Sequence, residues 1–553
     1  MMTSEEIKEI LSPILAGDIH IEQEMLEKYS HDASLFEVKP QVVIFPKNSS
    51  DVQAIMKWVG ENKKEHPKLS VTARSAGTDM SGGAINDSII LDFTRYMNTV
   101  REIKDGVGVV EPGCFYRDFE KETLKQGLFM PAYTASREIC AVGGMAGNNA
   151  GGENTVKYGK VEDFIAHLRV VFTDGNEYLI KPTDREGLED KSREESLEGK
   201  IYREISELIF QNKEKIMSAK PNVSKNSAGY YLWNVWDEQG QVFDLCKLII
   251  GSQGTLGIIT EIGFKLVRKP AYGSLLAIFM PSLEKLPEVV GEVMTFKPDS
   301  FETYDDYSLK LAIKFFFDFF AQMGFVNAIR LGLQFIPELR LLLVHGIPKL
   351  TLLVQFTGEN KEEVQNRLAE LQKKITHFGL KSRLAKSEIE AEKYWEVRRQ
   401  SFNMLRKHVH RRRTAPFIDD IIVKPEYLPE FLPKVEAVLS EYKLIYTIAG
   451  HAGDGNFHII PLMNLESPYS SDQILEISQK IYTLVLEYKG SITAEHNDGI
   501  IRTPYLEKMY GAEIVQLFKK TKEIFDFFYI LNPGKKVGGT FEDIKNKLIR
   551  KNN

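Results

Sequence analysis

The sequence of 553 residues is poor in cysteine, with only Cys114, Cys140 and Cys246. The three are far apart and form no C-x-x-C pair, which excludes a disulfide framework and a self-contained iron–sulfur cluster of the usual spacing. A reducing, cytoplasmic location is therefore the default expectation. The opening stretch MMTSEEIKEILSPIL also lacks the basic start and long apolar run of a secretory signal.

Long uncharged apolar runs are missing as well, and this argues against a membrane-spanning helix. The nearest candidate is the phenylalanine-rich stretch 311–344, which is interrupted by Lys314, Asp318, Arg330, Glu338 and Arg340. This pattern favours a buried helical pair or a protein interface, including that of a homodimer. Peripheral contact with the inner face of a membrane stays open.

Charge of one sign is not in excess. The net charge of −6 and the pI near 6.1 argue against nucleic acid as a partner. With 43% hydrophobic and 27% charged residues the chain is typical of a folded globular protein, and its length predicts two or more domains.

Hydrophobic patterning changes once along the chain. Strand and helix patterns alternate with short connections up to about residue 268, as in the strand 42–45 followed by an amphipathic helix. Within that part, the charged stretch 184–199 is expected to be a solvated excursion. Beyond it, apolar strands separated by charged helices predict an antiparallel α+β domain. A helix starting near residue 513 is expected to stop at the Asn-Pro-Gly of residues 532–534.

Three glycine-rich loops stand out in the first half: 74–83, 141–159 and 251–260. None has the order of a P-loop or of a Rossmann G-x-G-x-x-G. Glycine lets backbone N–H groups approach a ligand closely, so three such loops in one α/β region indicate a wrapped diphosphate.

These loops carry a resemblance. RSAGTDMSGG, GGMAGNNAGG followed by KYG, and GSQGTLGIIT resemble the FAD-binding domain of the vanillyl-alcohol oxidase/PCMH superfamily. The second half resembles the FAD-linked oxidase C-terminal domain of the glycolate oxidase D-subunit/D-lactate dehydrogenase group. The resemblance implies an α+β fold: a two-subdomain PCMH-type FAD-binding domain, an antiparallel α+β substrate (cap) domain, and a C-terminal helix that returns to the FAD domain. The expected divisions are a helical lead-in at 1–36, the FAD domain at 37–268, the cap at 269–500 with an aromatic-rich insertion at 308–345, and a C-terminal helical segment at 501–553.

The same resemblance implies the residues that contact FAD. It assigns the diphosphate to Ser75, Ala76, Gly77, Thr78 and Ser81; the flavin to Gly143, Gly144, Gly147 and Asn148; and the adenine end to Ile258 and Ile259. Further expected contacts are Asp79, Gly82, Pro131, Ser136, Gly151, Tyr158, Gly254, Gly257 and Asn532. Relatives with a histidyl-linked flavin carry histidine at the position of Thr78, which cannot form that bond, so the FAD is expected to be non-covalent.

Two histidines bracket the loop HAGDGNFH, His451 and His458. Alone, the pair is equally compatible with structural hydrogen bonding. A second segment, GSITAEHNDG, adds Glu495 and His496 at a predicted strand end. Two imidazoles and a carboxylate suit Zn²⁺ or Mn²⁺. The resemblance implies that His451, His458 and Glu495 bind the metal and that His496 is the catalytic base. Relatives have glycine after E-H, whereas this chain has Asn497, a residue that tolerates left-handed backbone.

On the substrate side, the resemblance places Arg398, in the predicted helix 394–406, where relatives hold the substrate carboxylate. Its neighbour Arg399 is expected to be a solvated surface residue. Relatives acting on D-2-hydroxyglutarate have a lysine where this chain has Ile418, which favours a monocarboxylate, although the basic tract 407–416 offers another source of positive charge.

The implied function is an FAD-dependent dehydrogenase. It would oxidise a D-2-hydroxy acid, with D-lactate favoured, to the 2-keto acid. The metal lowers the hydroxyl pKa, His496 takes the proton, and the hydride passes to FAD. Without a nicotinamide fingerprint or cluster cysteines, the electron acceptor is expected to be external: a quinone, an electron-transfer flavoprotein or an iron–sulfur protein. Docking of the acceptor on residues 311–344 is a hypothesis.

Several alternatives stay open. Glycolate or D-2-hydroxyglutarate could be the substrate. The chain could be a non-catalytic flavin-binding subunit, although the complete set of histidines and Glu495 argues against that. An ether-lipid synthase-like transferase would want a histidine cluster that HVHRRR resembles only faintly, and a metallohydrolase without flavin would leave three glycine loops unexplained.

Overall fold

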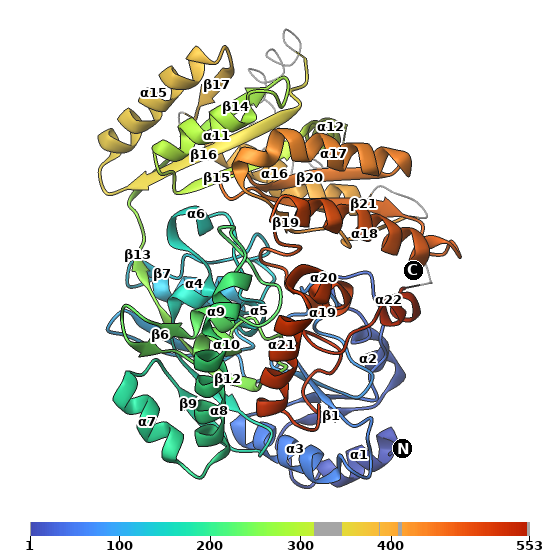
Figure 1. The fold of residues 1–553 in the computed structure, drawn as a ribbon. Coiled ribbons are helices and arrows are strands. Elements are labelled where there is room, and N and C mark those ends of the chain that lie inside the picture. Colours follow the sequence, from blue (N-terminus) through green and yellow to red (C-terminus); the bar gives the residue numbers. More distant parts are fainter. Residues whose placement is uncertain (1, 315–345, 386, 408–411, 550–553) are drawn as a thin grey trace.

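The computed structural model describes residues 2–314, 346–385, 387–407 and 412–549. They form two lobes, drawn one above the other in Figure 1. The chain leaves the lower lobe after β13 (Val267–Arg268), builds the upper lobe, and returns to the lower one with α19 (Gly499–Arg502).

The first sheet of the lower lobe has four strands in the order β1-β2-β4-β3. They are β1 (Asp18–His20), β2 (Val42–Phe45), β4 (Ile89–Asp92) and β3 (Val71–Arg74). The last three are parallel, and every residue of the apolar β2 is buried. Helix α3 (Ser49–Asn62), capped by the side chain of Asn48, packs against this sheet as predicted. The expected helical lead-in holds α1 (Ser4–Leu11) and α2 (Gln23–Lys28), but it also contributes β1, which pairs antiparallel with β2.

The second sheet of the lower lobe has five antiparallel strands in the order β5-β6-β12-β8-β9. They are β5 (Val100–Lys104), β6 (Val107–Val110), β12 (Ile258–Lys265), β8 (Ile165–Val171) and β9 (Glu177–Ile180). The main helices that share a hydrophobic core with this sheet are α4 (Tyr116–Leu124), α5 (Val142–Asn148) and α8 (Leu197–Gln211).

The charged stretch 184–199 is helical, and most of its residues are exposed or half-buried, in agreement with a solvated excursion. It forms α7 (Arg185–Arg193) and the first turn of α8. The side chains of Asp184 and Ser196 cap these helices by accepting N–H bonds from Gly187 and Gly199. In α7, Leu188 is buried against the lobe. This apolar contact and the two helix caps explain why so highly charged a segment is folded.

The upper lobe is built on one large antiparallel sheet in the order β17-β14-β16-β15-β20-β21-β18, with β19 also paired to β21. The strands are β17 (Lys381–Leu384), β14 (Tyr272–Met280), β16 (Leu350–Gly358), β15 (Ser300–Asp305), β20 (Ile445–His451), β21 (Asn456–Met463), β18 (Arg413–Thr414) and β19 (Ile421–Ile422).

Helices cover both faces of this sheet, which explains the unbroken apolar run LLAIFM in β14. Leu276, Ile278 and Met280 join the core under one set of helices: α11 (Leu286–Thr295), α15 (Lys361–His377), α17 (Leu428–Glu441) and α18 (Ser470–Glu487). The alternate residues Leu275, Ala277 and Phe279 pack on the other side with aromatic residues of α16 (Glu388–Lys407).

The returning segment packs on the lower lobe. It holds α20 (Leu506–Tyr510), α21 (Ala512–Phe525) and α22 (Phe541–Lys547). Phe518 of α21 enters the core of the five-stranded sheet, and Leu531 forms a parallel bridge with Val71 of β3. The prediction that the helix runs to Asn-Pro-Gly is wrong, since α21 ends at Phe525. The carboxylate of Asp526 accepts the N–H groups of Ile530 and Leu531 and so turns the chain first.

The aromatic-rich stretch 311–344 lies almost entirely outside the described residues. Within the parts of the chain that are described, no helix combines the length and apolar character needed to cross a bilayer.

A buried ion pair fastens the returning segment. The Nζ atom of Lys536 lies 2.9 Å from Oδ2 of Asp498, and both side chains are fully buried. The ammonium also donates to the carbonyl oxygens of Ser227 and Gly229 in the lower lobe. Breaking one side of such a pair leaves an uncompensated charge in the interior.

We therefore expect Lys536→Met to lower the free energy of unfolding by about 3–5 kcal/mol. Urea unfolding followed by circular dichroism would measure the change. Lys480→Met, which removes an exposed ion pair between Lys480 of α18 and Glu441 of α17, is the control and should leave the midpoint unchanged. Equal midpoints for the two variants would contradict the role given to Lys536.

Candidate active site

The histidine loop is the hairpin between β20 and β21. His451 is the last residue of β20 and lies opposite Asn456, while His458 follows two residues into β21. The turn needs glycine at residue 455, because φ is +73° there and a Cβ would lie 2.0 Å from the carbonyl oxygen of Val423. The hairpin thus presents both imidazoles at one edge of the upper lobe.

The two histidines converge with the distant Glu495. Atom Oε1 of Glu495 lies 3.1 Å from Nε2 of His451 and 3.5 Å from Nε2 of His458. Ligands 2.0–2.2 Å from one tetrahedral ion are about 3.3–3.6 Å apart, so both distances from Glu495 are close to those of ligands that share a cation. The three residues predicted as metal ligands therefore lie together around the Glu495 carboxylate.

Outer partners orient all three donors. Nδ1 of His451 lies 2.6 Å from Glu302 and Nδ1 of His458 lies 3.1 Å from Asp419, so in each ring Nε2, which faces Glu495, is the nitrogen that could bind a cation. The second oxygen of Glu495 lies 3.2 Å from Nζ of Lys225, a fully buried lysine that also pairs with Asp454. Lys225, together with the other charges around it, holds the pKa of Glu495 well below its usual range against the opposing effect of burial.

Asp420 lies near this cluster, and its carboxylate, His458, Glu495 and His496 have donor atoms within 4.8 Å of one another. Its oxygens are already engaged, however. Oδ2 accepts the Thr493 hydroxyl and three consecutive backbone N–H groups, those of residues 494–496, and Oδ1 accepts the amide of Asn456. We therefore assign Asp420 to holding the loop rather than to a cation.

His496 stacks on His458, with ring centroids 4.9 Å apart and planes 19° from parallel. Its Nδ1 lies 2.7 Å from Oδ2 of Asp419, so one carboxylate orients both the ligand His458 and the predicted base. Burial lowers the pKa of His496, but Asp419 and Asp420 raise it on balance. The Nδ1 contact leaves Nε2 as the proton acceptor. The expected strand is absent here: residues 492–498 are irregular and take their shape from the Asp420 carboxylate.

Arg398 is buried on α16 and forms an ion pair with Glu302, whose other oxygen contacts His451. The predicted carboxylate-binding residue is thereby joined to the histidine cluster. The expectation for Arg399 is wrong. Its side chain is 22% exposed and pairs with Glu153 of the second glycine loop at 3.3 Å, because α16 faces that loop across the lobes.

The three glycine loops meet one another, as a single ligand site requires. Asn148 donates to Asp79 at 2.7 Å, and Gln253 of the third loop donates to Ser81 at 3.0 Å and to Asn148 at 3.3 Å. In the first loop, the backbone N–H groups of residues 75–78 donate to no described residue. Four free donors in a half-buried loop fit a diphosphate. Gly144 is exposed, and a Cβ at Gly147 would meet nothing within 4 Å, which leaves room for a ring system.

Other predicted cofactor residues have structural contacts. Asn532 donates to the carbonyl oxygens of Gly83 and Gln253, which ties the first and third loops together. Gly82 and Gly254 have positive φ, and a Cβ at Gly151 would lie 2.7 Å from Oε2 of Glu495, so the second loop touches the predicted metal ligand. The carbonyl oxygen of Pro131 accepts a hydrogen bond from the Asn154 side chain, and the hydroxyl groups of Ser136 and Thr134 are hydrogen-bonded to each other. The ring of Tyr158 packs edge-on to that of Phe129, and a Cβ at Gly257 would clash with Val170. Ile258 is in the core and Ile259 is half-buried.

Asp419, Glu302 and Lys225 were missed by the sequence reasoning. Two adjacent acids directly before the apolar stretch IIV were a usable signal, since buried aspartates are rare without partners. Glu302 and Lys225 stand alone in their segments, and no local pattern marks them.

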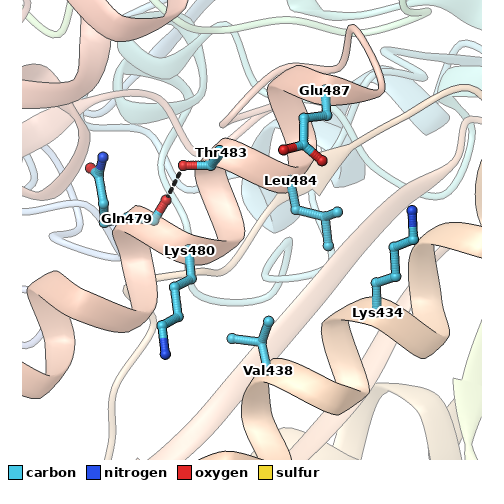
Figure 2. Close-up of a pocket in the computed structure, with 7 residues that line it drawn as sticks. All are labelled: Lys434, Val438, Gln479, Lys480, Thr483, Leu484 and Glu487. Atoms are coloured by element: carbon cyan, nitrogen blue, oxygen red, sulfur yellow. Dashed lines mark hydrogen bonds between the residues drawn. The ribbon is translucent and has the colours of Figure 1, made fainter.

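A separate depression of about 340 Å³ lies on the outer side of α17 and α18 (Figure 2). It is lined by Lys434, Val438, Gln479, Lys480, Thr483, Leu484 and Glu487. Lys434 bonds Tyr488 and Lys480 pairs with Glu441, and no predicted site residue reaches it. It is not part of the candidate site.

Comparison with known proteins gives the family context. Residues 40–179 match the model of an FAD binding domain, and residues 269–536 match that of the FAD linked oxidases, C-terminal domain. The D-2-hydroxyglutarate dehydrogenase of Pseudomonas putida is 27% identical over 91% of this chain, which spans about half (49%) of that relative. The D-lactate dehydrogenase of Anaerostipes hadrus is 26% identical over 96% of both chains. The 4-ethylphenol oxidase of Gulosibacter chungangensis shares the fold, with a TM-score of 0.67 at 14% identity over 97% of both chains.

The shared carboxylate of Asp419 leads to a prediction. In Asp419→Asn the amide can accept from only one of the two imidazoles, His458 and His496, and turns its NH₂ toward the other; the imidazole that keeps an acceptor has a neutral one in place of a carboxylate, so the outer support of His458 is weakened or lost. We expect Zn²⁺ affinity to fall about 10- to 100-fold. Competition with a chromophoric chelator would measure it. Asp472→Asn, an exposed carboxylate paired with Lys545, is the control, and an affinity equal to that of the control would show that Asp419 does not support the site.

Proposed function

Because this chain belongs to the FAD-linked oxidases, we propose that it oxidises a D-2-hydroxy acid to the 2-keto acid with FAD and a divalent metal, Zn²⁺ or Mn²⁺. The observation that carries the proposal is the convergence of His451, His458 and Glu495 beside His496, against the second glycine loop. The names of two relatives, a D-2-hydroxyglutarate dehydrogenase and a D-lactate dehydrogenase, support the substrate class.

His496 is proposed as the base. Its Nε2 would take the proton of the substrate hydroxyl, and Asp419 would stabilise the imidazolium that forms, since it contacts Nδ1 at 2.7 Å. When bound, FAD would supply two-electron oxidation and the metal would lower the pKa of the hydroxyl. Residues 75–78 and the neighbouring loops would hold FAD, while His451, His458 and Glu495 would hold the metal.

Arg398 is proposed to orient the substrate carboxylate. It approaches the cluster from α16, and its pair with Glu302 fixes one side of the guanidinium. A guanidinium has five N–H donors in a planar fork, a geometry that matches a carboxylate bidentately.

A monocarboxylate, with D-lactate first, is favoured over a dicarboxylate. Ile418 is fully buried in the apolar core and supplies no charge, and Lys225 is engaged by Glu495 and Asp454. D-2-hydroxyglutarate and glycolate are the alternative substrates. Electrons would leave to an external acceptor: a quinone, an electron-transfer flavoprotein or an iron–sulfur protein.

A substrate panel tests the proposal. With an artificial dye as acceptor, D-lactate should give the highest kcat/KM among D-lactate, D-2-hydroxyglutarate and glycolate. Prolonged treatment with a chelator should abolish the activity, and added Zn²⁺ or Mn²⁺ should restore it, because the metal activates the hydroxyl. Full activity in protein shown by elemental analysis to be free of metal would refute the metal role, and a failure to oxidise any 2-hydroxy acid would refute the reaction.

The linkage of FAD is a separate prediction. Thr78 has no imidazole to bond the flavin, so acid precipitation should release all of the yellow chromophore into the supernatant. Absorbance at flavin wavelengths in the supernatant and the dissolved pellet would measure the partition. A pellet that keeps its flavin would show a covalent bond through another residue.

A further inference from the structure

Asn497 directly follows the proposed base and has an unusual conformation. Its φ is +70°, in the left-handed region, and its side chain is fully buried. The amide nitrogen Nδ2 donates to two backbone carbonyl oxygens, that of Gly251 at 2.8 Å and that of Asn148 at 3.2 Å. The amide oxygen accepts the N–H of Asp498 at 2.7 Å. Every hydrogen-bonding group of this side chain has a partner.

The two carbonyl groups belong to different glycine loops. Asn148 ends α5 in the second loop, and Gly251 opens the third. These loops are already joined by backbone bonds from Gly251 to Ala146 and from Gln253 to Gly147. The amide of Asn497 therefore meets a preformed surface of the FAD domain and adds two bonds across the boundary between the lobes.

The other side of the same loop is fixed by the upper lobe. Asp420 accepts the N–H groups of Ala494, Glu495 and His496 at 2.7–2.8 Å. One residue later, the contacts pass to the FAD domain: Asn497 to the two carbonyl groups, then the N–H of Gly499 to Oε1 of Gln253 at 2.8 Å. The carbonyl oxygen of Ala494 already accepts from Lys160 of the lower lobe, but the run of groups held by Asp420 ends at His496, and Asn497 is the first residue after the base whose side chain binds the glycine loops.

We propose that Asn497 is a positioning residue that sets the register of His496 and Glu495 relative to the flavin-binding loops. This inference rests on the proposed function. Asp420 of the upper lobe orients the backbone of the base, His496. The Asn497 amide then fixes the distance between His496 and the loops assigned to FAD.

The chemistry of the side chain defines matched variants. Glycine adopts a φ of +70° without strain, so Asn497→Gly keeps the backbone and removes the amide. Aspartate also tolerates this conformation and has nearly the same shape, but a carboxylate has no N–H to donate and would face two carbonyl oxygens. If the donated bonds matter, aspartate will be at least as harmful as glycine. If only the backbone conformation matters, both variants will behave as wild type.

The test compares wild type, Asn497→Gly and Asn497→Asp as FAD- and Zn²⁺-loaded proteins. Because misplacement of about 1 Å can cost about 10²-fold in rate, kcat with D-lactate and dye should fall 10- to 100-fold in Asn497→Gly, with KM changed much less. FAD and Zn²⁺ content should stay at wild-type levels. Asp105→Gly, a left-handed position in an exposed turn, is the control and should keep the wild-type kcat.

Hydrogen exchange provides a readout that does not depend on turnover. Both variants should exchange faster than wild type in peptides covering residues 493–499 and 146–153, with no change in α17. Wild-type kcat and wild-type exchange in Asn497→Gly would overturn the proposal, as would an aspartate variant that behaves as wild type. If wild type oxidises no acid in the panel, the proposed function fails, and the exchange result alone decides on Asn497.

Discussion

The carboxylate of Asp420 is the constraint on which the candidate site depends. One of its oxygens accepts three consecutive backbone N–H groups and a hydroxyl from residues 493–496. An irregular segment buried between two lobes has no ladder to satisfy its N–H groups, and a charged acceptor does so strongly. The curl that results turns Glu495 toward the two histidines of the hairpin and leaves His496 stacked on His458. Neighbouring residues thus acquire different partners without a strand.

The site belongs to neither lobe alone. The upper lobe supplies the histidine hairpin, Asp419 and Glu302, whereas Lys225 comes from the lower lobe and contacts the oxygen of Glu495 other than the one nearest the histidines. Lys160 of the FAD domain likewise donates to the carbonyl oxygen of Ala494. These ammonium groups are buried and therefore need partners. Both carboxylates paired with Lys225, those of Asp454 and Glu495, come from the upper lobe, whereas Lys160 also donates to Asn226 and Ser227 of its own lobe. The charges that shape the site are the same charges that hold the lobes together.

Sequence patterns predicted the parts of this arrangement that depend on residues close together in the sequence. The glycine loops and the H-x-G-D-G-N-x-H hairpin are contiguous, so residue type and spacing mark them as candidate sites, and the resemblance supplies the chemistry expected of them. The helix of Arg398 and the strands around β14 also follow from hydrophobic period. Glu302, Asp419 and Lys225 could not be found in this way, because sheet order and lobe packing bring single residues together from three separate segments. The end of α21 was misplaced for a related reason: Asn-Pro-Gly is a visible stop signal, but Asp526 stops the helix earlier through bonds to residues 530 and 531.

The contacts of Asn532 have a consequence for how the cofactor site is assembled. Its amide group contacts Thr72, Gly83 and Gln253, residues that precede it by 279 to 460 positions. During synthesis the first and third loops therefore emerge long before the residue that clamps them. The join that Asn532 makes between these two loops can therefore form only after the upper lobe has been made and the chain has come back to the lower lobe.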